Sequence, residues 1–243
     1  MACLAASGQG LFAYAERSFE PAIIVAEYPG NTVRHRLTRT AADRDGAPLL
    51  AIDALALSSD GSTLVAVERG QPGHLVVWSL ATGAPVAAVP LWFSPRGTAV
   101  EFAPDSSTQF ALTGADSVSL WSVEMCDALT TLVPRTVPLQ EPTVVPGATL
   151  QAVLARARRR GTPHPTTCAW TATDRLFVAC AGGELFSVDT AAATASPCNL
   201  AFAVTACVAH RGLLVVAGAS KTKGKRKEKE KRRKRKGKEK EGK

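Results

Sequence analysis

The sequence predicts an all-β fold built from repeats, because two kinds of short segment recur along it. In the first kind, a turn residue is followed by an alternating apolar strand, at residues 73–78 (GHLVVW), 116–121 (DSVSLW) and 183–188 (GELFSV). Trp78 and Trp121 close the first two of these segments and are 43 residues apart. A period of about 40–45 residues is typical of β-propeller blades, which are four-stranded sheets packed side by side. The repeat therefore predicts a rigid binding platform.

The second kind of recurring segment is a hairpin ahead of each strand. Residues 55–67 place two apolar runs on either side of a Ser-Asp-Gly-Ser turn. Asp-Gly favours a tight turn, because Gly tolerates positive φ and Asp partly accommodates it. The same layout returns at residues 100–114, 168–182 and 206–218. Asp60, Asp105 and Asp174 recur once per blade, so we interpret them as turn-forming residues.

A weaker copy at the N-terminus, residues 11–15 and 22–28, brings the prediction to about five blades. The last blade is incomplete, since its apolar run ends at Val215 and Val216 shortly before a lysine tract. We therefore expect an incomplete propeller that belongs to a fragment or a truncated reading frame. The alternative is a complete protein that closes as a small or irregular propeller.

The charge is divided unevenly between a body, residues 1–220, and a tail, residues 221–243. The body carries 14 Lys+Arg and 17 Asp+Glu, a net charge of −3, whereas the tail carries 15 Lys+Arg and 4 Glu, a net charge of +11. The net charge of +8 for the whole chain thus belongs to the tail. Alternating Val, Leu and Ala runs favour an all-β body, a partial propeller over residues 1–220, and a disordered Lys/Arg/Glu-rich tail over 221–243.

Dense basic runs bind polyanions by counterion release, so the tail is a candidate polyanion-binding site. It contains no aromatic and no apolar residue, which supports neither base stacking nor a coiled-coil seam. A solvated extension without a dedicated partner is the equally weighted alternative. The candidate contacts are Lys225, Arg226, Lys227, Lys231, Arg232, Arg233, Lys234, Arg235 and Lys236.

One stretch, at about residues 126–164, is unlike a blade. Four prolines, at positions 134, 138, 142 and 146, precede a run at residues 150–160 (LQAVLARARRR). We expect a Pro-rich insertion with a short basic helix over residues 150–159. Insertions in repeat proteins map to loops on one face, so this one either binds a partner or is a plain surface excursion.

The sequence contains no arrangement of residues typical of an enzyme or a metal site. The six cysteines include no Cys-x-x-Cys pair, and no histidine lies at ligand spacing from them. We place His35 in a basic loop, His74 at the start of a strand and His210 at a hairpin turn, and we assign a turn or core role to each of these and to His164. The sequence therefore predicts no catalytic residue, no cofactor and no metal.

Cysteines in apolar strand runs indicate a reducing compartment. The N-terminus lacks the basic start and apolar run of a secretory signal, and no apolar run approaches the roughly 20 residues that span a bilayer. We expect a soluble, intracellular protein without a membrane span.

The repeats depart from the standard WD repeat, because Ser79 and Ser122 follow Trp78 and Trp121 in place of Asp. Three pairs of segments are informative: 57–61 leading to 74–78, 100–104 leading to 119–121, and 164–170 leading to 174–186. They resemble the divergent WD-repeat region of the large cilia- and flagella-associated proteins that tether an inner dynein arm to the doublet microtubule. The third pair is the most specific, with a histidine before an apolar-Trp strand and then a Gly-Glu-Leu hairpin.

The resemblance covers residues 1–219 and implies a WD40-like β-propeller. Members of the family are far longer, with further blades and a coiled-coil C-terminal half. It also implies a non-enzymatic scaffold of the axoneme, in the cytoplasm, cytoskeleton and cilium or flagellum. The implied partners are axonemal dynein-associated subunits and microtubule doublet proteins. From the charge of the tail, we expect no nucleic-acid binding except through it. Trp170 is either a binding anchor or, as we favour, a core residue.

Two other functions remain open. The chain could be a nuclear or ribonucleoprotein WD-repeat protein whose basic tail binds RNA or directs nuclear import. It could also be a generic WD-repeat adaptor of cytosolic assemblies. Deletion of residues 221–243 separates the nuclear or ribonucleoprotein function from the axonemal one, because only the nuclear function depends on the tail.

Overall fold

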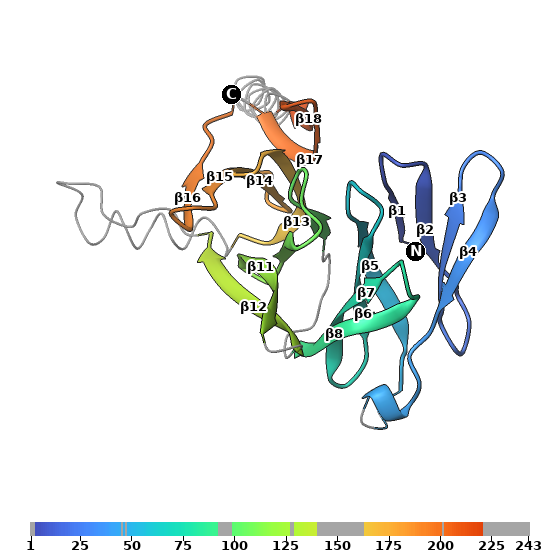
Figure 1. Ribbon diagram of the computed structural model, residues 1–243. Coiled ribbons are helices and arrows are strands. Elements are labelled where there is room, and N and C mark those ends of the chain that lie inside the picture. The colour runs from blue at the N-terminus through green and yellow to red at the C-terminus, as the bar shows by residue number, and fades with distance from the viewer. Residues whose placement is uncertain are drawn as a thin grey trace, which may run out of the picture.

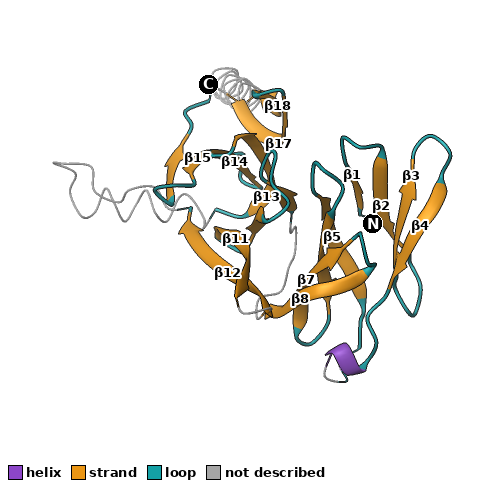
Figure 2. Ribbon diagram, in the orientation of Figure 1, coloured by secondary structure: helices purple, strands orange, loops and turns teal. Residues whose placement is uncertain are grey.

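The computed structural model describes residues 3–44, 46, 48–91, 99–126, 129–139, 163–200 and 202–220. These residues form five antiparallel sheets, numbered 1 to 5 in chain order, in which each strand pairs with the next one along the chain. Figure 1 shows the sheets side by side in an arc, from the blue N-terminal sheet to the red C-terminal one. Strands dominate the described residues, and one short 3₁₀ turn, Ala42–Arg44, precedes sheet 2 (Figure 2).

Four of the sheets have four strands, and sheet 5 has two. Sheet 1 contains β1 (Leu4–Ala6), β2 (Leu11–Ala15), β3 (Ile23–Glu27) and β4 (Thr32–Leu37). Sheet 2 contains β5 (Ala51–Leu57), β6 (Thr63–Arg69), β7 (Gly73–Ser79) and β8 (Ala84–Leu91). Sheet 3 contains β9 (Val100–Phe102), β10 (Gln109–Thr113), β11 (Ser117–Cys126) and β12 (Leu129–Pro138). Sheet 4 contains β13 (Pro165–Ala172), β14 (Arg175–Cys180), β15 (Leu185–Asp189) and β16 (Thr194–Pro197), and sheet 5 contains β17 (Phe202–His210) and β18 (Leu213–Ser220). The described residues thus confirm the prediction of about five blades, and two strands of the last one are described.

The aspartates expected in turns lie in turns. Between β5 and β6, the Asp60 carboxylate accepts hydrogen bonds from the Ser58 hydroxyl (2.6 Å) and the Ser62 amide (3.0 Å). These hydrogen bonds, that of Ser58 first, lower the pKa of Asp60. Asp105, between β9 and β10, has a φ of 56°, in the left-handed region that short polar side chains tolerate. The repeated aspartates therefore set the hairpin turns of successive blades.

The expected insertion at 126–164 is wrong in its first part. Residues Leu129–Pro138 form β12, which pairs with β11 along the full length of both strands. Pro134 and Pro138 fit there because β12 is the edge of sheet 3, where a missing N–H costs no ladder hydrogen bond. The rest of the proposed insertion, including the helix expected at 150–159, lies outside the described residues. His35 also corrects a prediction, since it lies in strand β4 opposite Val25 rather than in a loop.

The core of the arc is divided into four apolar clusters, each shared by two consecutive sheets. We call the face of a sheet toward the preceding sheet its leading face, and the face toward the following sheet its trailing face. The buried aromatic side chains of the clusters all lie on leading faces: Trp78, Phe102, Phe110, Trp121, Trp170 and Phe186. The buried trailing-face residues are aliphatic, for example Val65 and Val67 of sheet 2. Each of the first three interfaces thus places large leading-face aromatic side chains on an aliphatic trailing face.

Candidate binding groove between the first two sheets

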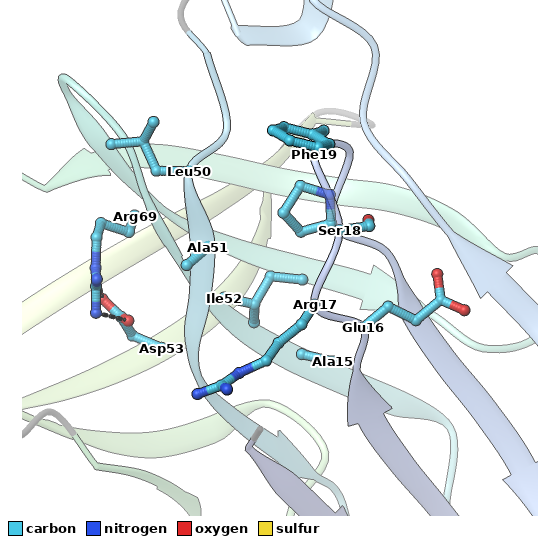
Figure 3. Close-up of a pocket in the computed structure, with 11 residues that line it drawn as sticks. Ala15, Glu16, Arg17, Ser18, Phe19, Leu50, Ala51, Ile52, Asp53 and Arg69 are labelled. Carbon is cyan, nitrogen blue, oxygen red and sulfur yellow. Dashed lines mark hydrogen bonds and ion pairs between the residues drawn. The ribbon is translucent and has the colours of Figure 1, made fainter. Parts of the chain in front are cut away.

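A groove of about 610 Å³ lies between sheets 1 and 2. The loop between β2 and β3 forms one wall, and the start of β5 with the end of β6 forms the other (Figure 3). Both walls reach the same end of the arc because the turn after β2 and the connection from β4 to β5 lie at that end of their sheets. The groove is lined by Ala15, Glu16, Arg17, Ser18, Phe19, Pro21, Leu50, Ala51, Ile52, Asp53 and Arg69. Its volume is within the range of about 300–1,000 Å³ that is typical of ligand sites.

The floor and the rim of the groove are apolar. Ala15 and Ile52 are buried and belong to the cluster shared by sheets 1 and 2. Phe19 and Leu50 lie on opposite walls at one end of the groove (Figure 3), and their side chains are 105% and 57% exposed. Large apolar side chains that flank a hollow and face solvent are typical of interaction sites. The rim therefore offers a place for an apolar side chain of a partner.

One of the charged side chains at the groove is a cation without an ion-pair partner among the described residues. Arg69 pairs with Asp53 through two hydrogen bonds, of which Nε to Oδ2 is 2.9 Å, and Arg36 pairs with Glu16 at 2.7 Å. Arg17 is exposed and has no ion-pair partner among the described residues. In Figure 3 its side chain extends from the loop toward β5. The groove thus presents an unpaired positive charge below an apolar rim, which suits a carboxylate.

A buried ion pair supports the wall formed by β5. Arg39, in the connection from β4, contacts Glu68 of β6 through Nη1 and Oε2 at 2.9 Å, and both side chains are 3% exposed. Arg39 also donates to the carbonyl oxygen of Asp43. Burial raises the pKa of Glu68, and the Arg39 charge opposes that shift. The Leu50 amide donates to the Arg69 carbonyl oxygen at 2.9 Å. This hydrogen bond holds the residue before β5 against the end of β6.

The residues singled out in the sequence do not form a second site. The nine basic tail residues lie outside the described residues. The four histidines are spread over β4, the start of β7, the residue before β13 and the end of β17. Within the described ranges, no group of three or more metal-ligating side chains is present. Trp170 is buried in the cluster shared by sheets 3 and 4, so its core role is confirmed.

The cysteines are all free thiols. Cys168, Cys180 and Cys207 are buried in strands, as the apolar runs predicted, and Cys126 is exposed. Burial raises the pKa of the Cys180 thiol to about 12 and that of Cys168 well above its usual value. Buried thiols of this kind are unreactive and pack as small apolar groups.

The residues that line the groove were not predicted from the sequence to form a site. Phe19 within the polar run at residues 16–20 (ERSFE) was an available signal, since a large apolar residue is unusual in a charged loop. Leu50 belongs to the other wall, 31 residues further along the chain, and no local pattern brings it opposite Phe19.

Comparison with known structures identifies the architecture. The β-propeller domain of Myceliophteria thermophila Cps50 (Swd1) superimposes with a TM-score of 0.64 at 16% sequence identity, over 89% of this chain and 62% of that one. The fold is a WD40-type β-propeller. The departures of its repeats from the standard WD pattern therefore leave the blade architecture intact.

Comparison of sequences gives a relative of much greater length. A stretch of 97 residues is 40% identical to Centriole proteome protein 16 of Chlamydomonas reinhardtii. It amounts to 40% of this chain and 4% of that protein, so the matched stretch is a small part of this relative's length. No family model matches the sequence. The described part of the chain contains no helix with the length and apolar character that crossing a bilayer requires.

Proposed function

We propose that this WD40-type propeller is a non-enzymatic, protein-binding scaffold of the ciliary or flagellar axoneme. In this function it tethers inner dynein arm components to doublet microtubules and supports motility. The groove between sheets 1 and 2 carries the proposal of protein binding, because it combines an apolar rim with an unpaired cation. The similarity to a centriole proteome protein supports the cytoskeletal location.

The groove suits an extended acidic peptide. A bulky apolar side chain of the peptide would lie between Phe19 and Leu50, and a neighbouring carboxylate would pair with Arg17. Full burial of one large apolar side chain contributes roughly 1.5–3 kcal/mol, whereas an exposed ion pair contributes about 0–1 kcal/mol. The apolar rim should therefore set most of the affinity, and Arg17 should set orientation and the rate of association.

The test uses the full chain with a fluorescent tag in Chlamydomonas reinhardtii, followed by detergent extraction of isolated flagella. We expect the wild-type chain to remain with the axonemes. The double variant Phe19→Ser, Leu50→Ser should be lost from that fraction at least fivefold. Met125→Ser is the matched control, since Met125 is 83% exposed but lies in sheet 3, and it should behave as the wild type. Release of the wild-type chain with the detergent-soluble proteins would overturn the proposal.

Deletion of residues 221–243 separates this function from the nuclear one. In the axonemal function the deletion changes neither location nor retention. In the nuclear or ribonucleoprotein function it abolishes nuclear location and a salt-dependent affinity for a single-stranded RNA oligonucleotide, because the tail carries all the excess positive charge. A nuclear wild-type chain that becomes cytoplasmic on deletion would replace the axonemal proposal.

A further inference from the structure

Glu101 places a carboxyl group in the interface between sheets 3 and 4. It lies on β9 between Val100 and Phe102, which belong to the cluster shared with sheet 2, so its own side chain alternates to the trailing face, toward sheet 4. By strand pairing, the equivalent trailing-face residues of sheets 2 and 4 are Ala56 and Ala169, and both are buried. Sheet 3 thus has a partly buried carboxyl group where the two neighbouring sheets have a methyl group.

The carboxyl group of Glu101 is held by sheet 4. It accepts a hydrogen bond from the backbone N–H of Trp170 on β13, and the Trp170 indole donates to the Glu101 carbonyl oxygen at 3.2 Å. Burial raises the pKa of Glu101 to about 7, and the Trp170 hydrogen bond only partly opposes that shift. The closed interface therefore favours the protonated, uncharged form of this side chain.

The groups around Glu101 offer its charged form no cation. The strands that contact β9 on this side are β10, which has no ionisable side chain, and β13, whose ionisable group is the Cys168 thiol. Cys207 on β17 also interacts with Glu101. Burial is the main cause of the raised pKa of both thiols, and the Glu101 charge adds to it. None of the ion pairs among the described residues includes Glu101, so its ionised form lacks a partner of opposite charge there.

The last strands of the same two sheets are joined by a contact that does not titrate in this range. Arg135 on β12 donates to the carbonyl oxygens of Thr190 and Ala191, at 3.3 and 2.9 Å, in the turn before β16. A guanidinium group stays charged at any pH at which a carboxyl group titrates. The interface between sheets 3 and 4 thus has a proton-dependent contact at its first strands and a proton-independent contact at its last strands.

We propose that Glu101 is a proton-controlled contact between sheets 3 and 4: loss of its proton separates β9 from β13, while Arg135 keeps the last strands together. Opening transfers the carboxyl group to water, where it ionises as an ordinary glutamate. Each opening then releases a proton, so a rising pH favours the open form until the closed form is ionised as well. The hydrogen bonds within each sheet stay intact, because the sheets separate as units. This inference does not depend on the groove or on the axonemal location.

The size of the effect follows from the acidity of Glu101 in the two forms. With a pKa of about 7 in the closed form and 4.5 in water, the ratio of open to closed molecules should rise about tenfold between pH 6 and pH 8.

Two buried thiols report on this opening. Cys168 belongs to the cluster shared by sheets 3 and 4, whereas Cys207 belongs to the cluster shared by sheets 4 and 5. The test is pulse labelling of the full chain with N-ethylmaleimide at pH 6, 7 and 8, with fragment-ion mass spectrometry to assign the label to each cysteine. Each rate is divided by that of the urea-unfolded chain at the same pH, which removes the intrinsic pH dependence of thiol reactivity.

We expect the corrected rate at Cys168 to rise about tenfold from pH 6 to pH 8, and that at Cys207 to change less than twofold. Glu101→Gln, and Glu101→Ala with the residue of the equivalent positions, should both abolish the rise at Cys168. Glu124→Gln, at an exposed position in β11, is the control and should retain it. A flat rate at Cys168, an equal rise at Cys207, or a rise that persists in both Glu101 variants would overturn the inference.

Discussion

Trp170 on β13 donates its indole Nε1–H to the backbone carbonyl oxygen of Glu101 on β9, at 3.2 Å. The bond links the first strands of sheets 3 and 4, and it lies beside the apolar cluster that those sheets share. In the described part of the chain, the indole nitrogens of Trp78 and Trp121 are buried without a hydrogen-bond partner. The three buried tryptophans of the leading faces therefore differ in their polar contacts, although their apolar role is the same.

Replacement of Trp170 by Phe removes this hydrogen bond, and Trp78→Phe is the matched control. Both variants lose the same atoms from a buried leading-face position, but only Trp170→Phe loses a bond. A hydrogen bond contributes about 1 kcal/mol net, so we expect Trp170→Phe to lower the free energy of unfolding by about that much more than Trp78→Phe does. Urea unfolding measures both values. Equal losses would show that the bond adds nothing to stability.

Glu101 should make stability depend on pH. Burial raises its pKa to about 7, and a hydrogen bond from the Trp170 backbone only partly opposes the shift. Because the folded state holds this proton more tightly than the unfolded state, stability is expected to fall as the pH rises from about 4.5 to 7 and then to level off.

The variant Glu101→Gln should remove this slope and stabilise the protein at pH 8 by roughly 2–3 kcal/mol. Thermal unfolding at several pH values measures the effect. Glu124→Gln, at an exposed position in β11, is the control and should keep the wild-type slope. A slope that persists in Glu101→Gln would assign the pH dependence to another group.

The buried pair of Arg39 and Glu68 should behave as a unit. Arg39→Met leaves the Glu68 carboxylate buried without its partner, so we expect a loss of roughly 3–5 kcal/mol in the free energy of unfolding. Replacing both residues by Met should restore most of that loss, because no buried charge remains. Arg34→Ala, which breaks the exposed pair with Glu27, should have little effect. Urea unfolding of Arg39→Met, Glu68→Met and the double variant gives the coupling energy directly, and additive losses would contradict it.

Gly183 should be essential for the packing of sheet 5 on sheet 4. It has a φ of 87°, and a Cβ built on it lies 2.6 Å from the Cβ of Ala203. Gly183→Ala therefore adds a clash to the strain of about 1–2 kcal/mol that a left-handed residue costs. Gly46→Ala is the control, because Gly46 has a φ of 79° with nothing within 4 Å of its Cβ position.

The measurement for Gly183 is limited trypsin cleavage after Arg211, in the turn between β17 and β18. We expect cleavage to be faster in Gly183→Ala than in both the wild type and Gly46→Ala. If the two glycine variants are cleaved at the same rate, the contact with Ala203 is unimportant.

The blades were predictable because their signals are local: an apolar alternation, an Asp turn and a Trp at a fixed spacing. The prediction failed at β12, because prolines in this edge strand give it the composition of a loop. It also failed at His35, because the exposed arginines on β4 leave no clear alternation of apolar and polar residues. The groove could not be predicted, because Phe19 and Leu50 come from different sheets and meet only when these pack. The exposure of Val208 was equally hidden, because the register shift between Val204 and Ala206 places it on the opposite face from the buried Val204.

In the described part of the chain, no sheet of this arc has a core of its own, because every cluster is shared by two neighbouring sheets. The energy that holds a sheet therefore comes from its contacts with neighbouring sheets, and among the described residues sheets 1 and 5 each share a cluster with one other sheet. Opening should begin at these two sheets and spread inward, with amide hydrogens of sheet 3 exchanging most slowly.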